Sequence, residues 1–441
     1  MKKKLLLISL CLSLVFGMTA CSSALDADGD SAGDKGEYTR EGQWSDDTVI
    51  TFTDQQMLED VRKMTRIPEG DITYKDVKNI TVYTRDETAG KNSPVYTDIT
   101  PIQYFTSLTT LEIGVEKGVS PEPLKNLNHL TKLTFYGYKS LTDLSFLEGL
   151  TDLEELTIYD CSSLSGLRDL KNPTNLTRLR IVGSGDLTDL NALADLTNLS
   201  NLTINSCTGV TDISVLANLT NLQYLDIDNC SSLEDISVLG ALTDLRTLHI
   251  AGCDGITDIT ILENLINLTD LSIYDDNMED ISILRNLNKL EILIIHGNHL
   301  KEIGDLSNLT NLQILSIGGE NLTELIGLGY LPALDTLYIE NCSNLTDITG
   351  LRSLTNLEDL SINGCDSLTD IDVLRNLRNL EWLSIYSCDS LTDINALGNL
   401  TELRNLSIRE CGRLTNTEII TELPNLERVN IDHCGYLLES D

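Results

Sequence analysis

The sequence predicts an α/β solenoid, in which short parallel strands form one concave sheet and irregular or 3₁₀ turns form the convex side. A pattern Leu-x-Ile-x-x-Cys-x-x-Leu-x-Asp-Ile begins at Leu225 and begins again 23 residues later at Leu248. A fixed period of this length is typical of solenoids. The Leu-x-Ile alternation places two apolar side chains on one face of a strand. The leucines that follow in each repeat return the chain along the outer side and point inward.

The predicted strands follow one another along almost the whole chain. The strand leucines of successive repeats are 22 or 23 residues apart, and the repeats that contain cysteine are followed by the longer step. Parallel strands about 4.8 Å apart would extend over about 70 Å. The fifteen strand positions are Leu111, Leu133, Leu156, Leu179, Leu202, Leu225, Leu248, Leu271, Leu293, Leu315, Leu337, Leu360, Leu383, Leu406 and Val429.

The composition excludes several classes of function. The 441 residues carry a net charge of -37, which disfavours nucleic acid and bare anionic membrane as partners. With 5 His, 2 Trp and 5 Phe, the chain is poor in residues that build metal or cofactor sites. No nucleophile elbow, His-rich metal motif or Gly-rich phosphate loop is present. We therefore expect no enzyme activity, no cofactor and no metal.

The N-terminus has the pattern of an export signal. Three lysines precede an apolar run, and small residues lead to Cys21, so residues 1–20 read as a signal peptide that is too short to span a membrane. Ending on Ala-Cys, it resembles a bacterial lipoprotein signal, which implies lipidation of Cys21; an ordinary secretory signal is the alternative. Residues 21–47 are small, acidic and polar, and predict a disordered tether. The expected location is the extracellular face of the cell membrane, with membrane contact through the lipid only.

Residues 48–79 predict a helical N-terminal cap for the first repeat. Apolar residues follow Asp54 at helical spacing, Asp54 can cap that helix, and a second helical turn follows Gly70. Such a cap resembles that of internalin-like bacterial leucine-rich repeat proteins, and residues 80–434 resemble their 22-residue repeat. The resemblance implies a leucine-rich repeat domain with a role in adhesion or host contact. Residues 435–441 form a short tail.

Nine cysteines recur at one position of the repeat, five residues after a strand position. We interpret them as buried free thiols that fill the turn after the strand. Disulfides, which exported proteins can form, and soft-metal binding are the alternatives. Internalin repeats usually carry Asn at this position, and Asn298 keeps that residue type, whereas Ser184, Asp276 and Glu320 do not. The cysteines are Cys161, Cys207, Cys230, Cys253, Cys342, Cys365, Cys388, Cys411 and Cys434.

An acidic residue recurs ahead of the outer turn of most repeats. We expect each carboxylate to accept backbone N–H groups at the start of that turn, as a cap does. Calcium binding is the alternative, although no Gly-rich calcium loop accompanies these residues. The residues are Asp143, Asp189, Asp212, Asp235, Asp258, Asp280, Glu302, Glu324, Asp347, Asp370 and Asp393.

The concave face is the expected site of function, because its side chains are not needed for the core. Aromatic side chains are typical of binding hot spots, although cross-strand packing alone would also favour them. Trp382 is the strongest single candidate. The candidate partner-binding residues are Tyr224, His249, Tyr274 and His296 in the middle of the array, and Tyr338, Trp382 and Tyr386 nearer its end.

These features predict a surface-anchored lipoprotein that binds a host or bacterial surface protein through its concave face. A carbohydrate or cell-wall ligand is the first alternative, because aromatic side chains flanked by carboxylates also suit sugars. A structural envelope protein is the second. Identification of the ligand requires more than the fold.

Overall fold

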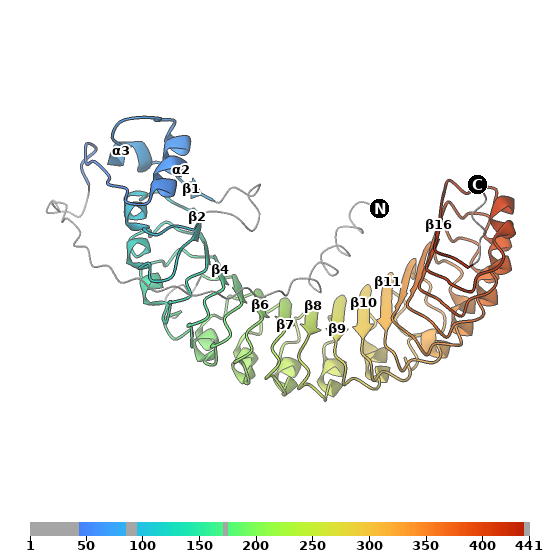
Figure 1. Cartoon of the computed structure of the whole chain (residues 1–441). Helices are drawn as coiled ribbons and strands as arrows, with labels where there is room; N and C mark the ends of the chain where they lie inside the picture. The colour runs from blue at the N-terminus through green and yellow to red at the C-terminus, as the bar shows by residue number, and fades with distance from the viewer. Residues whose placement is uncertain (1–43, 85–94, 171–174, 436–441) are drawn as a thin grey trace. The chain divides into compact units, whose positions relative to one another are not determined.

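The strand leucines and isoleucines of successive repeats lie side by side in one parallel sheet of sixteen strands, whose order follows the sequence (Figure 1). The structure is a computed structural model that describes residues 44–84, 95–170 and 175–435. Residues 45–441 form one compact unit. The solenoid prediction is confirmed, and one strand, β1 (Val82–Tyr83), precedes the fifteen predicted ones.

The register of the sheet pairs the same position of each repeat. Leu225 lies beside Leu248, and Ile227 lies beside Ile250. These leucines and isoleucines are buried in every repeat before the last. The strands are β1, β2 (Thr110–Gly114), β3 (Lys132–Tyr136), β4 (Glu155–Tyr159), β5 (Arg178–Val182), β6 (Asn201–Asn205), β7 (Tyr224–Asp228), β8 (Thr247–Ala251), β9 (Asp270–Tyr274), β10 (Ile292–His296), β11 (Ile314–Gly318), β12 (Thr336–Glu340), β13 (Asp359–Asn363), β14 (Trp382–Tyr386), β15 (Asn405–Arg409) and β16 (Arg428–Asp432).

Short 3₁₀ helices form the side opposite the sheet, as predicted, and the strands line the concave side (Figure 1). Their leucines, such as Leu239, are buried against the strands. The 3₁₀ helices are η2 (Thr100–Tyr104), η3 (Glu122–Leu124), η4 (Ser145–Leu147), η5 (Asn191–Asp195), η6 (Ser214–Asn218), η7 (Ser237–Ala241), η8 (Thr260–Asn264), η9 (Ser282–Asn286), η10 (Ile326–Leu328), η11 (Thr349–Ser353), η12 (Asp372–Asn376), η13 (Asn395–Asn399) and η14 (Glu418–Glu422).

The acidic column caps these turns. Asp235 Oδ1 accepts a hydrogen bond of 2.7 Å from the backbone N–H of Ser237, and Asp393 accepts one of 2.6 Å from Asn395. The bond lowers the pKa of Asp235 below its usual range. The capping prediction is confirmed at the nine aspartates.

The same prediction is wrong for Glu302 and Glu324, which make no such bond within the described residues. Each does form an isolated backbone bridge to the equivalent aspartate of a neighbouring repeat, as capping aspartates also do. A turn closed by a side chain onto the N–H two residues later suits the short side chain of Asp or Asn, and Glu is one methylene longer. In the repeat of Glu302, Asp305 supplies the bond to Ser307, at 2.9 Å.

The N-terminal cap covers the first repeats with helix α2 (Gln55–Thr65) and the short helix α3 (Tyr74–Val77). Asp54 caps α2 as predicted, because its Oδ1 accepts a 2.8 Å bond from Met57 N–H. Its Oδ2 accepts a 2.7 Å bond from the N–H of Thr97, which ties the cap to the chain ahead of β2. Met57 and Val61 are fully buried, so the helix closes the apolar end of the array.

Two residues ahead of the predicted start of the cap at residue 48 contact its lysines. The folded unit starts at Ser45. Asp46 pairs with Lys78, and Asp47 lies 3.7 Å from Lys75. The predicted signal peptide, Cys21 and most of the predicted tether lie outside the described residues. No helix within the described ranges is long and apolar enough to cross a membrane.

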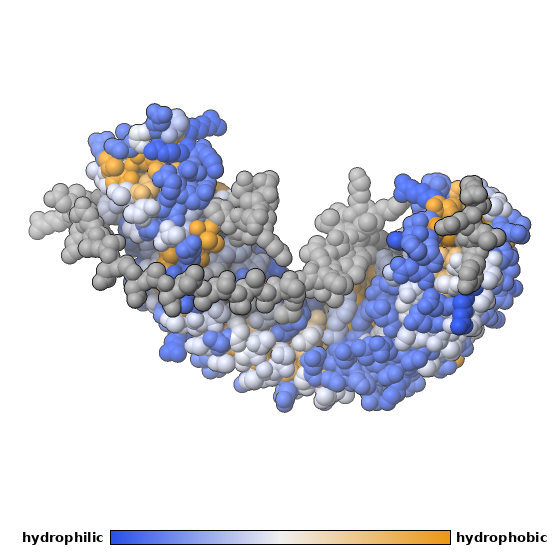
Figure 2. Space-filling view, viewed as in Figure 1, coloured by the Kyte–Doolittle hydropathy of each residue, from blue (hydrophilic) through white to orange (hydrophobic). Residues whose placement is uncertain are grey.

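The last strand forms a more exposed end. Val429 of β16 is 50% exposed, whereas the equivalent Leu406 of β15 is 2% exposed. Figure 2 shows hydrophobic residues at the surface near this end and near the N-terminal cap. A repeat in the middle of the array has a neighbour on both sides, so its core position is covered twice.

The nine cysteines of the array are buried and unpaired. Each thiol donates to a nearby backbone carbonyl: Cys230 Sγ lies 3.6 Å from the oxygens of Asp228 and Ile204. A thiol is a small apolar group with a weak donor, so it tolerates long hydrogen bonds better than a hydroxyl does. The interpretation as buried free thiols agrees with the structure.

The position equivalent to the cysteines in the shorter repeats differs from the prediction. In a cysteine repeat, the N–H of Leu233 donates to the carbonyl of Cys230. In the repeats of β9 and β10, the equivalent hydrogen bonds go to the carbonyls of Asp275 and Gly297, so these two residues are equivalent to the cysteine. These residues are buried and follow the strand position by four residues, whereas Asn298 is exposed. The cysteine repeats contain one additional residue before the turn. In the repeat of Cys230 this residue is Asn229, which has the left-handed backbone conformation with φ 52°.

Ser184 occupies the cysteine position in its repeat and shows why a thiol suits it. Its side chain is fully buried, and its hydroxyl has no hydrogen-bond partner in the described chain. A buried unpaired hydroxyl costs about 1–3 kcal/mol.

We expect Ser184→Cys to raise the free energy of unfolding by about 1 kcal/mol, because a thiol loses less on burial than an unpaired hydroxyl. Urea unfolding followed by circular dichroism measures the change. The control Ser361→Cys, on the outward side of β13, should leave stability unchanged. Equal or lower stability of Ser184→Cys would contradict the account of this column.

Candidate functional site

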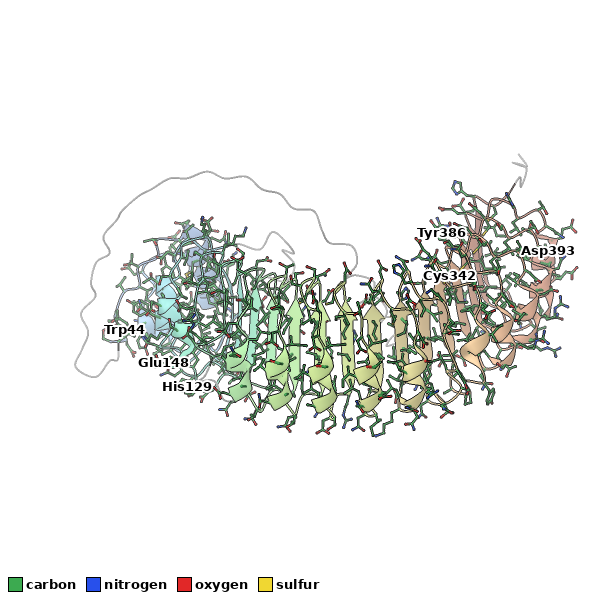
Figure 3. All side chains as sticks on the ribbon, turned by 90° about the horizontal axis from the view of Figure 1, so that it is seen from below. Trp44, His129, Glu148, Cys342, Tyr386 and Asp393 are labelled. Atoms are coloured by element: carbon green, nitrogen blue, oxygen red, sulfur yellow. The ribbon has the colours of Figure 1, made fainter. Side chains whose placement is uncertain are left out.

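The outward side chains of the sheet form three columns: the first, third and fifth residues of each strand. In β7 these are Tyr224, Asp226 and Asp228, while Leu225 and Ile227 between them are buried. The parallel register places equivalent side chains of neighbouring strands next to each other, about 4.8 Å apart. Figure 3 shows the end of β14 at Tyr386 and the turn side at Asp393 as separate regions of the array. The Leu and Ile side chains between the columns, and not the columns themselves, thus supply most of the core of the sheet.

The four predicted residues in the middle of the array form two ring pairs. The rings of Tyr224 and His249 lie 5.8 Å apart, and those of Tyr274 and His296 stack at 4.8 Å. All four side chains are half-buried. Each pair joins neighbouring strands, β7 with β8 and β9 with β10, so these are cross-strand pairs.

The His296 side chain is held as a neutral imidazole. Its Nε2 lies 2.9 Å from Ser316 Oγ and 3.8 Å from a carboxylate oxygen of Glu340. Burial lowers the pKa of His296 to about 4 and raises the pKa of Glu340. At neutral pH, His296 therefore contributes a hydrogen-bonding ring and not a positive charge.

The three predicted residues near the end of the array are not in ring contact with one another in the described structure. Trp382 and Tyr386 stand at opposite ends of β14, four residues apart, and Tyr338 lies two strands away in β12. Four residues of a strand span about 13 Å. Trp382 is 37% exposed, and it is the most open of the seven predicted residues.

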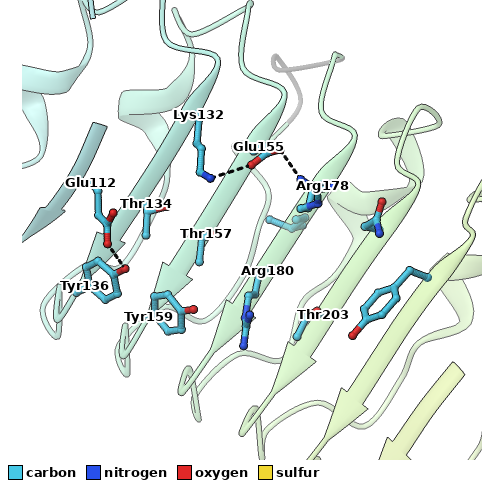
Figure 4. Close-up of a pocket in the computed structure, with 13 residues that line it drawn as sticks. Glu112, Lys132, Thr134, Tyr136, Glu155, Thr157, Tyr159, Arg178, Arg180 and Thr203 are labelled. Carbon is cyan, nitrogen blue, oxygen red and sulfur yellow. Dashed lines mark hydrogen bonds and ion pairs between the residues drawn. The ribbon is translucent and has the colours of Figure 1, made fainter. Parts of the chain in front are cut away.

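A hollow that the sequence analysis did not single out lies over β2–β7 (Figure 4). It has a volume of about 440 Å³. Its floor is the third column, where Thr134, Thr157 and Thr203 present short side chains. Tyrosines of the fifth column form one side, and charged residues of the first column form the other.

The fifth-column side of the hollow is a stack of flat groups. Tyr136 and Tyr159 stack with ring centroids 4.8 Å apart and an angle of 4° between them. The guanidinium of Arg180 lies 5.6 Å from the centre of the Tyr159 ring, a cation–π contact. At the other end, Tyr136 donates a 2.5 Å hydrogen bond to Glu112.

The opposite side of the hollow is an ion network on three neighbouring strands. Glu155 lies between Lys132, at 3.3 Å, and Arg178, with which it is also paired (Figure 4). One carboxylate therefore serves two cations. Such partly exposed pairs contribute little stability, but they fix the side chains that flank the hollow.

Beyond the hollow, the charge of the sheet changes sign. Asp226 and Asp228 face outward from β7, and Asp228 accepts a 2.7 Å bond from the amide of Asn205. Burial and the charge of Asp228 raise the pKa of Asp226 to about 6. Burial also raises the pKa of Asp228. The face thus has a cationic and an acidic region within a few strands.

The alternation of buried and outward residues along each strand is enough to place Tyr136, Tyr159 and Arg180 on the outward face, but the sequence analysis did not group them. The signal was available in the register, because Tyr136 and Tyr159 occupy the same column of adjacent strands. The contact of Arg180 with Tyr159 joins different columns, so it depends on side-chain conformation and not on register alone.

A second hollow of about 440 Å³ lies between η11 and η12 on the turn side. Its polar lining includes the capping residues Asp347 and Asp370 and the pair of Arg375 with Asp372. These carboxylates already accept backbone bonds. Within the described ranges, no group of three or more His, Cys, Asp or Glu side chains is arranged to hold a metal ion.

We expect Asp226→Asn to stabilise the protein at pH 7. Because the pKa of Asp226 is raised on folding, the folded state binds the carboxyl proton more tightly than the unfolded state does. Proton binding therefore stabilises the folded state at low pH, and this stabilisation is lost as the pH rises through about 6. Asn carries no such charge and avoids the loss. The gain at pH 7 should be on the order of 2 kcal/mol, and it should shrink as the pH falls towards 4.

Thermal unfolding of the variant and the natural protein between pH 4 and pH 7 measures this difference. The exposed Asp244→Asn serves as the matched control and should give a flat difference. A variant that is less stable at pH 7, or equally shifted at every pH, would contradict the assignment.

Family models match two parts of the repeat array. Residues 107–254 match the leucine-rich repeats of the plant disease resistance protein RPS2-like family, and residues 334–437 match the BspA type leucine rich repeat region, in six copies. A comparison with curated proteins gave no match.

Several solved structures resemble the chain. A leucine-rich repeat protein of Leptospira interrogans is 17% identical, with a TM-score of 0.56, over 79% of this chain and 99% of its own. A functional domain of InlJ from Listeria monocytogenes, described as including a cysteine ladder, is 20% identical with a TM-score of 0.52, over 81% and 75%. An internalin, InlF, of the same organism is 23% identical with a TM-score of 0.41, over 87% and 90%.

The Leptospira interrogans protein and the InlJ domain, both with TM-scores above 0.5, share the fold of this chain. The regular sheet, the 3₁₀ turns and the buried leucine positions agree with that likeness and with both family models. The chain is a leucine-rich repeat protein.

Proposed function

We propose that this protein is exported, held at the membrane by a lipid on Cys21, and binds a protein partner through the concave face of its sheet. The observation that carries the proposal is the set of aromatic and charged side chains on the outward columns, where nothing in the core requires them. Trp382, 37% exposed on a strand, is the clearest example. Exposed aromatic groups of this kind are enriched among residues that dominate binding.

The geometry of the face favours a large partner over a small substrate. The outward columns run along sixteen strands, and the aromatic groups are distributed over many of them. Small-molecule sites are usually concave pockets that enclose most of the ligand. An extended open sheet instead suits contact with another macromolecule, and the net charge of -37 disfavours nucleic acid.

The lipid anchor rests on the sequence around Cys21. Anchoring of this kind would leave the repeat array outside the membrane, where the concave face can meet a surface protein of the bacterium or of a host. Adhesion or host contact follows as the physiological role within this proposal.

The double variant Trp382→Ala with Tyr386→Ala should weaken binding of a selected protein partner by about thirtyfold or more, because loss of even one hot-spot residue costs about 2 kcal/mol or more. The partner is obtained by unbiased selection against surface proteins, with a glycan array in parallel, and affinity is measured by biolayer interferometry.

Tyr330→Ala is the control for this pair, because Tyr330 is an aromatic residue that is 58% exposed and lies outside the strands. Its variant should bind normally. Unchanged binding by the double variant would show that the site lies elsewhere, and binding to glycans alone would replace the protein partner with a carbohydrate.

Cys21→Ala should release the protein from the membrane fraction of a bacterial host, because the lipid attachment point is lost. Fractionation followed by immunoblotting measures the release. Cys11→Ala, which changes a cysteine inside the apolar run of the signal, should leave the protein in the membrane fraction. Continued retention of Cys21→Ala would refute the anchor.

A further inference from the structure

The geometry points to a carboxylate-binding subsite in the hollow over β2–β7, where Arg180 anchors an acidic side chain of an extended segment of the partner. This inference rests on the proposed function, since it assumes a protein partner on the concave face. It adds a position, an anchoring residue and a ligand chemistry to that function.

Arg180 is the unusual residue of the hollow, because no described residue accepts a hydrogen bond from its guanidinium. In the described parts of the chain, it makes no ion pair and no hydrogen bond, and its Nε is buried without a partner. Guanidinium groups that are buried in part normally find acceptors, because an unpaired buried donor is costly. A ligand that supplies two acceptor oxygens would satisfy this group.

The position of the guanidinium is fixed before any ligand arrives. Arg180 lies against Tyr159, Tyr159 stacks on Tyr136, and Tyr136 is hydrogen-bonded to Glu112. This chain of contacts holds a planar group that would otherwise move freely. A planar guanidinium with parallel N–H groups matches a carboxylate in two hydrogen bonds, whereas an ammonium is a point charge.

Among the described residues, no carboxylate that lines the hollow forms an ion pair with Arg180, although its charge acts on Asp226 from a distance. Three cationic and two acidic side chains line the hollow. Glu155 is paired with both Lys132 and Arg178, and Glu112 accepts the bond from Tyr136. The side chains that line the hollow therefore carry a net charge of +1, in a chain whose net charge is -37, and Arg180 is the one of the three cations that is in no ion pair within the described residues. A cationic site on such a protein is complementary to an acidic ligand.

The nearest acidic residue of the same column does not satisfy Arg180. Asp226 stands two strands away, on β7, with Thr203 between them. No ion pair joins them in the described residues. The threonine hydroxyls of the floor offer further donors for a ligand oxygen.

A peptide fits this arrangement better than a sugar. Tyr159 has one face against Tyr136 and the other against Arg180, so neither face of that ring is available for stacking on a sugar. An extended peptide needs only one acidic side chain to reach the guanidinium while its backbone lies across the open sheet.

The test uses fluorescence anisotropy of the full-length protein with a short fluorescein-labelled peptide of alternating Glu and Ser, and with the same peptide carrying Gln for Glu. We expect the Glu peptide to bind about tenfold tighter or more, because charge-assisted bonds to the guanidinium are lost with Gln. This comparison needs no variant, so it does not depend on the folding of one.

The variants then assign the effect to Arg180. Arg180→Lys should lose about tenfold in affinity for the Glu peptide, because an ammonium cannot form the paired bonds. Tyr159→Phe, which keeps the ring face, should bind normally, and Tyr159→Leu should bind weakly. Arg409→Lys is the matched control, because Arg409 also lies on the strand face but is paired with Asp432 at 3.6 Å.

Equal binding of the Glu and Gln peptides, or unchanged affinity of Arg180→Lys, would overturn the inference. Tighter binding of a uronic acid oligosaccharide than of the Glu peptide would also overturn it, in favour of an acidic sugar. The proposed function fails separately: a protein partner that depends on Trp382 would sustain it even if no acidic peptide binds near Arg180.

Discussion

The stacking of buried leucine and isoleucine at the same position of each repeat is the interaction on which the rest of the structure depends. Leu225 lies against Leu248, and that leucine lies against the next, so every layer is covered by its two neighbours. No single repeat has a core of its own. The two ends are therefore special: α2 covers the first, and Val429 at the last is half exposed.

The backbone of each turn is satisfied locally, and this allows the stack to continue without interruption. The aspartates accept hydrogen bonds from the N–H groups at the start of the outer turns, and the buried thiols donate to backbone carbonyls of strand residues. Both groups are small and repeat with the period of the chain. Because these groups lie away from the concave columns, the outward side chains can differ from one repeat to the next.

Much of this architecture could be predicted from the sequence, because it follows from periodicity. The strand positions, the 3₁₀ side, the cap at Asp54 and the aspartate turns all repeat or have a local signature. The error at Glu302 has a physical cause, since the sequence pattern treats Glu and Asp alike while the turn depends on side-chain length. The prediction that Asn298 occupies the cysteine position was wrong for a different physical reason. The cysteine repeats contain an extra residue in a left-handed conformation, which the spacing of the repeats alone does not reveal.

The candidate site was predictable only in part. Register alone places Tyr136 beside Tyr159, and it identifies Trp382 as an outward residue. It does not show that the guanidinium of Arg180 turns towards Tyr159, or that Glu155 is shared by two cations. These contacts depend on side-chain conformations, which several rotamers of long side chains could satisfy equally well.

The parallel register also fixes the distance between any two outward residues by the number of strands between them. Arg180 stands on β5 and Trp382 on β14, so nine strand spacings, about 43 Å along the sheet, separate the two candidate contact points. Gain or loss of one repeat by recombination would change that separation by about 4.8 Å while preserving every buried layer. Binding of a partner that contacts both points would therefore depend on the number of repeats between them.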